Sequence, residues 1–213
     1  MCCDFFNLKD QLLELEKIGI DYLHIDIIDG YFAKDFTFGT EIIKQIRSQT
    51  GIACDFHFMV KNPMYHLDTF QLRPGDMVSL HIESEINVDE CQKYFLDRGV
   101  LFGLALSPNS SINTVSRFLD NVGFFNLLCV NPGFKGQVLK VGSFERIAEL
   151  AELIEQKNKK VFIQADGNMN IKNVPLALKN GATSLVLGSS GLFIQNELLE
   201  INFEKIKKVV SKL

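Results

Sequence analysis

Seven short apolar runs, rich in β-branched residues, recur along the chain and predict buried strands. Most are apolar at nearly every position, which is typical of parallel strands covered on both faces. The predicted strands are Tyr22–Ile28, Cys54–Val60, Met77–Ile82, Leu101–Leu106, Asn126–Val130, Val161–Ala165 and Ser184–Leu187.

Amphipathic segments with helical periodicity lie between these runs. Their apolar stripes are Leu8, Leu12, Leu15 and Ile18; Ile42, Ile43 and Ile46; and Phe144, Ile147, Leu150, Leu153 and Ile154. The strand-to-strand interval of roughly 23 to 35 residues suits βα units with short loops.

The alternation predicts an α/β fold in one domain, residues 1–213, because no linker or change of composition divides the chain. An open doubly wound sheet would give the same alternation. Seven strands with eight helices favour a TIM (β/α)8 barrel, in which the first strand is missing from the N-terminus.

Composition narrows the class of protein. The chain is 46% hydrophobic and has a net charge of −4, which predicts no nucleic-acid partner. It contains no signal-peptide pattern and no apolar run near the roughly 18 residues of a membrane span, so we expect no membrane association. The cysteines are odd in number and scattered, which indicates reduced thiols and a cytoplasmic protein.

Ionisable residues fall at the ends of three predicted strands. His24 and Asp26 alternate onto one face, His57 lies near the end of its strand, and Asp166 lies at the tip of another. Strand ends form the functional face of a barrel, where two imidazoles and two carboxylates could hold Zn²⁺, Fe²⁺, Mn²⁺ or Co²⁺. Hydrogen-bonded core histidines and turn-forming aspartates explain the same spacing, so both interpretations stay open here.

Two glycine-containing segments follow later strands, at residues 130–137 and 188–193. Glycines allow backbone N–H groups to turn toward an anion, and barrels often bind phosphate at the loops after their last two strands. Glycines also simply permit tight turns, so each loop alone is a weak indication of phosphate binding.

At these residues the sequence resembles the ribulose-phosphate 3-epimerase family, from Met1 to about Phe193. The matching segments are His24–Gly30, Asp55–Met59, Ser79–Glu83, Val130–Gln137, Ala165–Gly167 and Gly188–Ser189. The resemblance implies an isomerase of carbohydrate metabolism, in the pentose phosphate pathway, with one divalent metal ion (Zn, Fe, Mn or Co). Its ligands would be His24, Asp26, His57 and Asp166.

The implied reaction inverts C3 of a ketose phosphate through a cis-enediolate. Asp26 and Asp166 would be the catalytic acid and base on opposite faces of C3. The substrate would be a pentulose (D-ribulose 5-phosphate/D-xylulose 5-phosphate) or a hexulose (D-allulose 6-phosphate/D-fructose 6-phosphate), and analogy predicts a homo-oligomer. The implied substrate-binding residues are His57, Met59, Gly133, Phe134, Lys135, Gly136, Asp166, Gly167, Asn168, Gly188, Ser189 and Ser190.

Some positions depart from the family pattern. Asn168 replaces a glycine common in ribulose-phosphate epimerases, and residues 188–193 look more like the allulose-6-phosphate branch, which we slightly favour. Lys135 replaces a small residue, and would either add charge to the phosphate site or point to solvent. His81 and Glu83 either orient metal ligands or make a structural hydrogen bond.

Family members begin with a strand ending in Pro-Ser-Leu or Pro-Ser-Ile, and this chain begins just after that point. We expect the natural start upstream, with a truncated gene as the alternative. A chain without that strand should form an imperfectly closed barrel with lower stability and weaker substrate positioning.

Two rival functions remain. The first is a non-catalytic phosphosugar-binding relative, disabled by the loss of the first strand. The second rival is a decarboxylase or aldolase of the related phosphate-binding barrels. Those of the orotidine-phosphate decarboxylase type use a lysine between two aspartates, and Asp26-Ile27-Ile28-Asp29 contains none, which argues against this rival.

Overall fold

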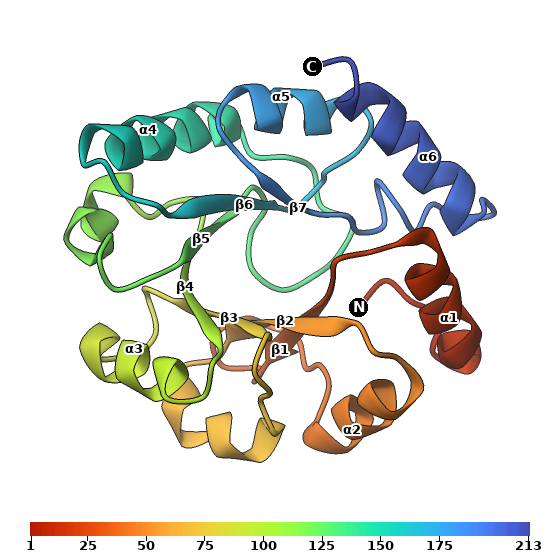
Figure 1. The fold of residues 1–213 in the computed structure, drawn as a ribbon, viewed down its shortest axis with the longest axis horizontal. Coiled ribbons are helices and arrows are strands. Elements are labelled where there is room, and N and C mark those ends of the chain that lie inside the picture. Colours follow the sequence, from red (N-terminus) through yellow and green to blue (C-terminus); the bar gives the residue numbers. More distant parts are fainter.

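Seven parallel strands pair in chain order, from β1 to β7, in the computed structural model, which describes residues 1–213 (Figure 1). The strands are β1 Tyr22–Ile28, β2 Ala53–Met59, β3 Met77–His81, β4 Leu101–Leu106, β5 Phe124–Leu128, β6 Phe162–Asp166 and β7 Ser184–Val186. The ring of strands with helices outside it confirms the predicted α/β fold of TIM-barrel type.

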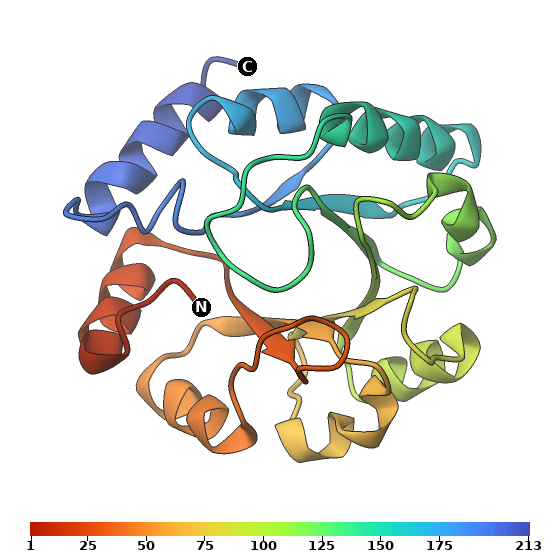
Figure 2. The same ribbon diagram turned by 180° about the vertical axis from the view of Figure 1, so that it is seen from behind.

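Six α-helices surround the ring (Figures 1 and 2). They are α1 Leu8–Ile18, α2 Thr40–Gln49, α3 Val88–Leu96, α4 Ser143–Gln156, α5 Asn173–Lys179 and α6 Leu199–Val210. The predicted stripes of α1 and α4 are buried at their centres, at Leu12, Leu15, Ile147 and Leu150. Ile42 of α2 is 40% exposed, so its place in the predicted stripe was wrong. None of these helices combines the length and the apolar character that crossing a membrane requires.

The expected count of eight helices includes two connections that are not α-helical, because these form 3-10 turns. These are η2 Pro63–Tyr65 with η3 Leu67–Phe70 after β2, and η4 Ile112–Phe118 after β4; η1 Phe5–Asn7 precedes α1. In η4 the hydroxyls of Thr114 and Ser116 each donate to the carbonyl three residues back. Such local bonds compete with the regular α-helical pattern and suit the tighter 3-10 geometry.

The strands β1 and β7 are the two edges of the sheet and do not pair with each other. The ring therefore opens between them, as the expected imperfect closure requires (Figures 1 and 2). Outside this opening α1 contacts α6, where Lys17 Nζ lies 3.7 Å from Glu200 Oε2. The N-terminal residues lie on the same side, with the Cys2 Sγ next to Gly188.

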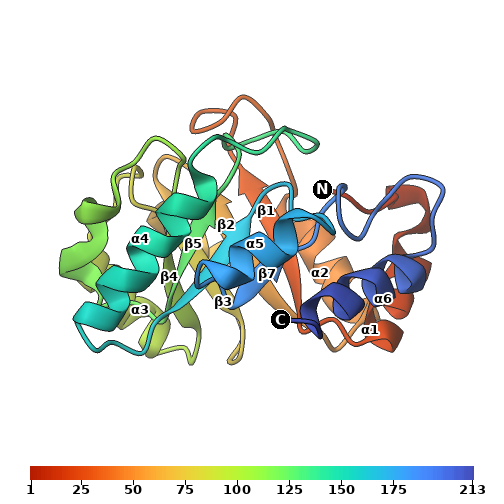
Figure 3. The same ribbon diagram turned by 90° about the horizontal axis from the view of Figure 1, so that it is seen from above.

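Two loops rise above the carboxyl ends of the strands (Figure 3). One follows β1 and covers residues 29–39, and the other follows β5 and covers residues 129–142. Asp29 fastens the first loop, because its carboxylate accepts hydrogen bonds from the backbone N–H groups of Tyr31, Phe32 and Lys61. Residues 130–137 of the second loop line the cavity described next.

Candidate active site

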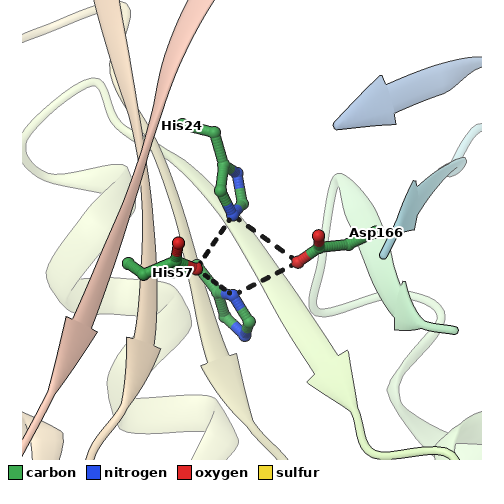
Figure 4. A group of neighbouring side chains, drawn as sticks. His24, His57 and Asp166 are labelled. Carbon is green, nitrogen blue, oxygen red and sulfur yellow. Dashed lines mark hydrogen bonds and ion pairs between the residues drawn. The ribbon is translucent and has the colours of Figure 1, made fainter. Parts of the chain in front are cut away.

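Four ionisable side chains converge inside the ring at the carboxyl ends of three strands (Figure 4). His24 and Asp26 come from β1, His57 comes from β2, and Asp166 ends β6. Alternation along β1 buries Leu23 and Ile25 on the other face. The parallel register places Asp26 beside His57, while β6 brings Asp166 from a separate part of the ring.

The four donor atoms lie within 4.8 Å of one another, close enough to share one metal ion. His24 Nε2 lies 3.4 Å from Asp26 Oδ1 and 3.6 Å from Asp166 Oδ2. His57 Nδ1 lies 3.3 Å from Asp26 Oδ1 and 3.4 Å from Asp166 Oδ2. Tetrahedral ligands at about 2.0–2.1 Å from an ion lie roughly 3.3–3.4 Å from one another. The cluster could therefore hold one divalent cation with little movement.

The environment of His24 supports the same conclusion. Its Nδ1 lies 2.7 Å from Asp55 Oδ2, and Asp55 is buried to 1% exposure. Because a carboxylate accepts this bond, the imidazole proton belongs on Nδ1. The other nitrogen, Nε2, is buried without a hydrogen-bond partner although two carboxylates lie nearby. An unshared lone pair directed into the cluster is what a metal ligand requires.

Burial and neighbouring charges shift the pKa values of this cluster strongly. Burial lowers the pKa of His24, but the charge of Asp55 and the close carboxylates of Asp26 and Asp55 outweigh it and hold that pKa well above its ordinary value. Burial raises the pKa of Asp26, but hydrogen bonds and charges of the two histidines bring it well below its usual range. The pKa of Asp166 is raised by burial, with a further contribution from the charge of Asp26. The cluster therefore favours an added positive charge, whether protons or a cation.

A second group of polar residues lies behind His57. His81 Nε2 is 2.9 Å from His57 Nε2, and His81 Nδ1 is 2.8 Å from Glu83 Oε2. Burial lowers the pKa of His81 to about 4. Burial would raise the pKa of Glu83, but hydrogen bonds, chiefly from His81, lower it to about 2. These contacts fit both predicted roles of the pair, the orientation of a metal ligand and a structural hydrogen bond.

One cavity extends from the cluster to the glycine-containing loops, with an empty volume of about 740 Å³ including its open mouth. Asp26, His57 and Asp166 line one end. All the predicted substrate-binding residues line this cavity: His57, Met59, Gly133, Phe134, Lys135, Gly136, Asp166, Gly167, Asn168, Gly188, Ser189 and Ser190. The structure thus brings together residues that are up to 133 positions apart, from His57 to Ser190, at one mouth.

Asn168 lies in the loop after β6 and joins it to the loop after β5. Its backbone is left-handed, with φ of 54°, a conformation that glycine and asparagine tolerate best. Its Nδ2 donates to the Gln137 carbonyl at 2.8 Å, and Gln137 Nε2 donates to the carbonyls of Asn131 and Phe134. The residue that replaces a glycine therefore keeps the turn and adds a cross-link between the loops.

Sequence reasoning missed several residues of the site. Asp55, the partner of His24, was not singled out, although it alternates onto the same face of its strand as His57. Gln164, whose Nε2 donates to Asp55 Oδ2 at 2.8 Å, was not singled out either. Met1 and Cys2 line the cavity, which no sequence pattern indicated. Lys135 Nζ donates to the Met1 carbonyl at 3.1 Å, a partner that neither predicted role of this lysine included.

Comparison with known proteins agrees with this geometry. The ribulose-phosphate 3 epimerase family model matches residues 1–193. The chain is 30% identical over 191 residues to the ribulose-phosphate 3-epimerase of Bacillus subtilis, covering 89% of this chain and 88% of that one. It is 34% identical over 191 residues to the enzyme of the same name from Chlamydia pneumoniae, covering 89% and 83% of the two chains.

Similarity to solved structures extends to the fold alone. A tryptophan synthase α-subunit from Pyrococcus furiosus matches with a TM-score of 0.66 at 14% identity, over 98% of this chain and 93% of that one. Phosphoribosyl anthranilate isomerase from Thermococcus kodakaraensis matches with a TM-score of 0.65 at 13% identity, over 94% and 93%. Together with the family match, these findings show that the chain belongs to the ribulose-phosphate 3-epimerase family and is an isomerase of the epimerase type.

Proposed function

We propose that this protein inverts C3 of D-ribulose 5-phosphate to give D-xylulose 5-phosphate, with Asp26 and Asp166 as its acid and base. The observation that carries the proposal is the approach of these two carboxylates to one point from separate strands, β1 and β6. Such an arrangement suits a proton that leaves one face of a carbon and returns on the other. The ribulose-phosphate 3-epimerase names of its relatives support the substrate.

The chemistry requires both a base and stabilisation of negative charge. The C3 proton lies beside a ketone carbonyl and is only weakly acidic. One aspartate takes this proton, and the other gives a proton to the opposite face of the cis-enediolate. Their roles exchange when the reaction runs in reverse, since both directions follow the same path through the enediolate. A divalent cation, when bound by His24, Asp26, His57 and Asp166, supplies positive charge that offsets the negative charge on the reacting oxygens.

The remaining residues bind and position the substrate. We assign the phosphate to the loop end of the cavity, where the turns at Gly133, Gly167 and Gly188 leave backbone close to the ligand. Ser189 and Ser190 offer hydroxyl donors there. Met59, buried to 2% exposure at the end of β2, lines the cavity on the metal side. The sugar would then span from the cluster to the loops.

The length of the sugar is the second question, because Asn168 and residues 188–193 resemble the allulose-6-phosphate branch. The experiment incubates the metal-loaded protein in D₂O with ribulose 5-phosphate and, separately, with allulose 6-phosphate. Deuterium entering C3 is followed by NMR. We expect exchange and net epimerisation of ribulose 5-phosphate at the higher kcat/KM. Faster turnover of allulose 6-phosphate would reassign the substrate, and no exchange with either would contradict the epimerase proposal.

We also propose that the protein works in the cytoplasm as a homo-oligomer. All five cysteines are free thiols, which is usual in reducing compartments. The oligomer is an expectation from the family. Light scattering on the eluted protein measures it, and a mass near the 24.1 kDa of one chain would contradict it.

A further inference from the structure

His81 stands between a cluster residue and a carboxylate that lies outside the cluster. Its Nε2 is 2.9 Å from His57 Nε2 and its Nδ1 is 2.8 Å from Glu83 Oε2. His57 and His81 are almost completely buried, with side chains 1% and 0% exposed. The ring of Phe32 lies over His81 with the centroids 4.5 Å apart. Water therefore has little access to this contact.

The two imidazoles meet edge to edge through their nitrogens. Their centroids are 5.0 Å apart and their planes differ by 27°. A nitrogen–nitrogen distance of 2.9 Å places the two Nε2 atoms between the centroids, which is a hydrogen-bond distance. One nitrogen must then carry a proton and the other must accept it.

Glu83 determines which nitrogen carries the proton. Its Oε2 accepts from His81, and its Oε1 accepts from the backbone N–H of Ser107 at 3.0 Å and from the hydroxyl of Ser110. Arg146 in turn holds this loop, donating to the carbonyls of Ser107 and Ser110. Because both carboxylate oxygens accept, His81 has its proton on Nδ1 and an acceptor lone pair on Nε2. His57 must then donate from Nε2, which leaves its Nδ1 lone pair facing Asp26 and Asp166.

We propose that Glu83 and His81 are positioning residues that fix the tautomer of His57 and so prepare its Nδ1 to bind the metal ion. The two histidines of the cluster are thus oriented differently. Asp55 contacts His24 directly, whereas Glu83 acts on His57 through a second imidazole. The inference rests on the proposed metal function, but metal affinity and tautomer measure it without epimerase activity.

The chain of hydrogen bonds from Glu83 through His81 to His57 is called the relay below. The substitution Glu83→Gln tests it, because a carboxylate can accept hydrogen bonds with both oxygens, whereas one end of an amide is an NH₂ donor. If the amide NH₂ faces His81, the Nδ1 atom of His81 must accept, so the proton of His81 moves to Nε2. The Nε2 atom of His57 must then accept in turn, and the proton of His57 moves to Nδ1. If the NH₂ faces Ser107, the carbonyl still accepts from His81, but the NH₂ meets the Ser107 N–H and that hydrogen bond is lost. Either orientation conflicts with the native arrangement. The matched control is Glu85→Gln, two residues along, where Glu85 only pairs with the exposed Lys61 at 3.3 Å.

The first measurement is a Co²⁺ titration of the chelator-treated full chain, followed by visible absorption. We expect Glu83→Gln to weaken Co²⁺ binding by about 10- to 100-fold, the usual effect of losing such a partner. Glu85→Gln should match the wild type. If the wild type binds Co²⁺ tightly and Glu83→Gln binds it with equal affinity, the relay is overturned but the proposed metal function is not. A wild type that binds no Co²⁺ would overturn the proposed metal function together with it.

A pair of His81 variants separates orientation from packing. Gln can present a carbonyl to the His57 Nε2–H, so His81→Gln should keep the Co²⁺ affinity within about threefold of the wild type. His81→Leu has no acceptor, so its Co²⁺ affinity should fall about as much as that of Glu83→Gln. Equal losses for the two variants would show that His81 only fills space, and would overturn the relay.

Nitrogen NMR of the Zn²⁺-loaded wild type reads the tautomers directly, even if every variant unfolds. The chain has only four histidines, and three lie in this site. We expect the proton of His57 on Nε2 and that of His81 on Nδ1. A proton on His57 Nδ1 would overturn the relay.

Discussion

The two ends of the cavity are built in different ways. The metal end consists of side chains from β1, β2 and β6, whose exposures range from 1% for His57 to 16% for Asp26 and Asp166. Hydrogen bonds to Asp55 and His81 fix its imidazoles. The loop end consists of glycine turns and exposed residues, such as Phe134 at 57% exposure. In the proposed function the chemistry is thus placed on rigid strands, and recognition of the phosphate is left to loops joined by a few polar contacts.

The largest expected effect is at the metal end. Asp166→Asn should lower kcat by roughly 10²- to 10⁴-fold, the range for loss of a general acid or base. Steady-state kinetics with ribulose 5-phosphate measures this, with metal content determined in parallel. Asp21→Asn is the matched control, because Asp21 is exposed just before β1, at the opposite end of the barrel. Retention of near-normal kcat by Asp166→Asn would remove the aspartate pair from the mechanism.

At the loop end, Gly167→Ala should reduce stability more than activity per folded molecule. Gly167 has φ of 109°, and an added Cβ would lie 2.6 Å from Val130 Cγ2. The left-handed backbone alone costs about 1–3 kcal/mol for other residues, and the clash adds to it. Gly136→Ala is the control, since Gly136 has φ of 79° but open space around its Cα. Denaturant unfolding compares them, and equal destabilisation would show that the clash with Val130 is unimportant.

A smaller effect is expected from removing the cross-link between the loops. Asn168→Gly keeps the left-handed turn but loses the bond to Gln137, which should raise KM by roughly 2- to 10-fold with little change in kcat. Inhibition by inorganic phosphate should weaken in parallel. Asn158→Gly offers the same change at another left-handed asparagine, after α4 and away from the cavity. A drop in kcat at constant KM would place Asn168 at the reacting end instead.

Lys135 gives the smallest predicted effect. Its ammonium is bonded to the Met1 carbonyl on the exposed rim, so Lys135→Gln should change kcat/KM by less than about threefold. A loss above about tenfold, largest at low salt, would assign this lysine to the phosphate after all.

The difference between the two ends also explains what the sequence could predict. Strands β1 and β4 have the predicted bounds, and alternation from His24 to Asp26 correctly placed both on one face. β5 begins at Phe124, two residues before the predicted Asn126, because pairing with Gly103 of β4 and Phe162 of β6 extends it. The contacts of Asp55 with His24 and of Asn168 with Gln137 depend on register and loop conformation. The local pattern of residues along the chain contains no information on register or on loop conformation.

The expectation of an imperfectly closed barrel concerns the edges of the same ring. The opening between β1 and β7 agrees with it. Lower stability and weaker substrate positioning stay predictions, tested by comparing the melting temperature and KM of this chain with those of a version that has a family-type first strand added at its N-terminus. Equal values for the two would contradict them.

The measurement that tests the central claim most directly is C3 exchange as a function of bound metal. The chelator-treated protein receives Co²⁺ in steps, and deuterium incorporation into ribulose 5-phosphate is followed in D₂O at each step. Because one ion would occupy the four-residue cluster, we expect no exchange at first, a linear rise, and a plateau at one equivalent. Full exchange in the chelator-treated protein, or none at one bound equivalent, would contradict a metal-assisted proton transfer at this site.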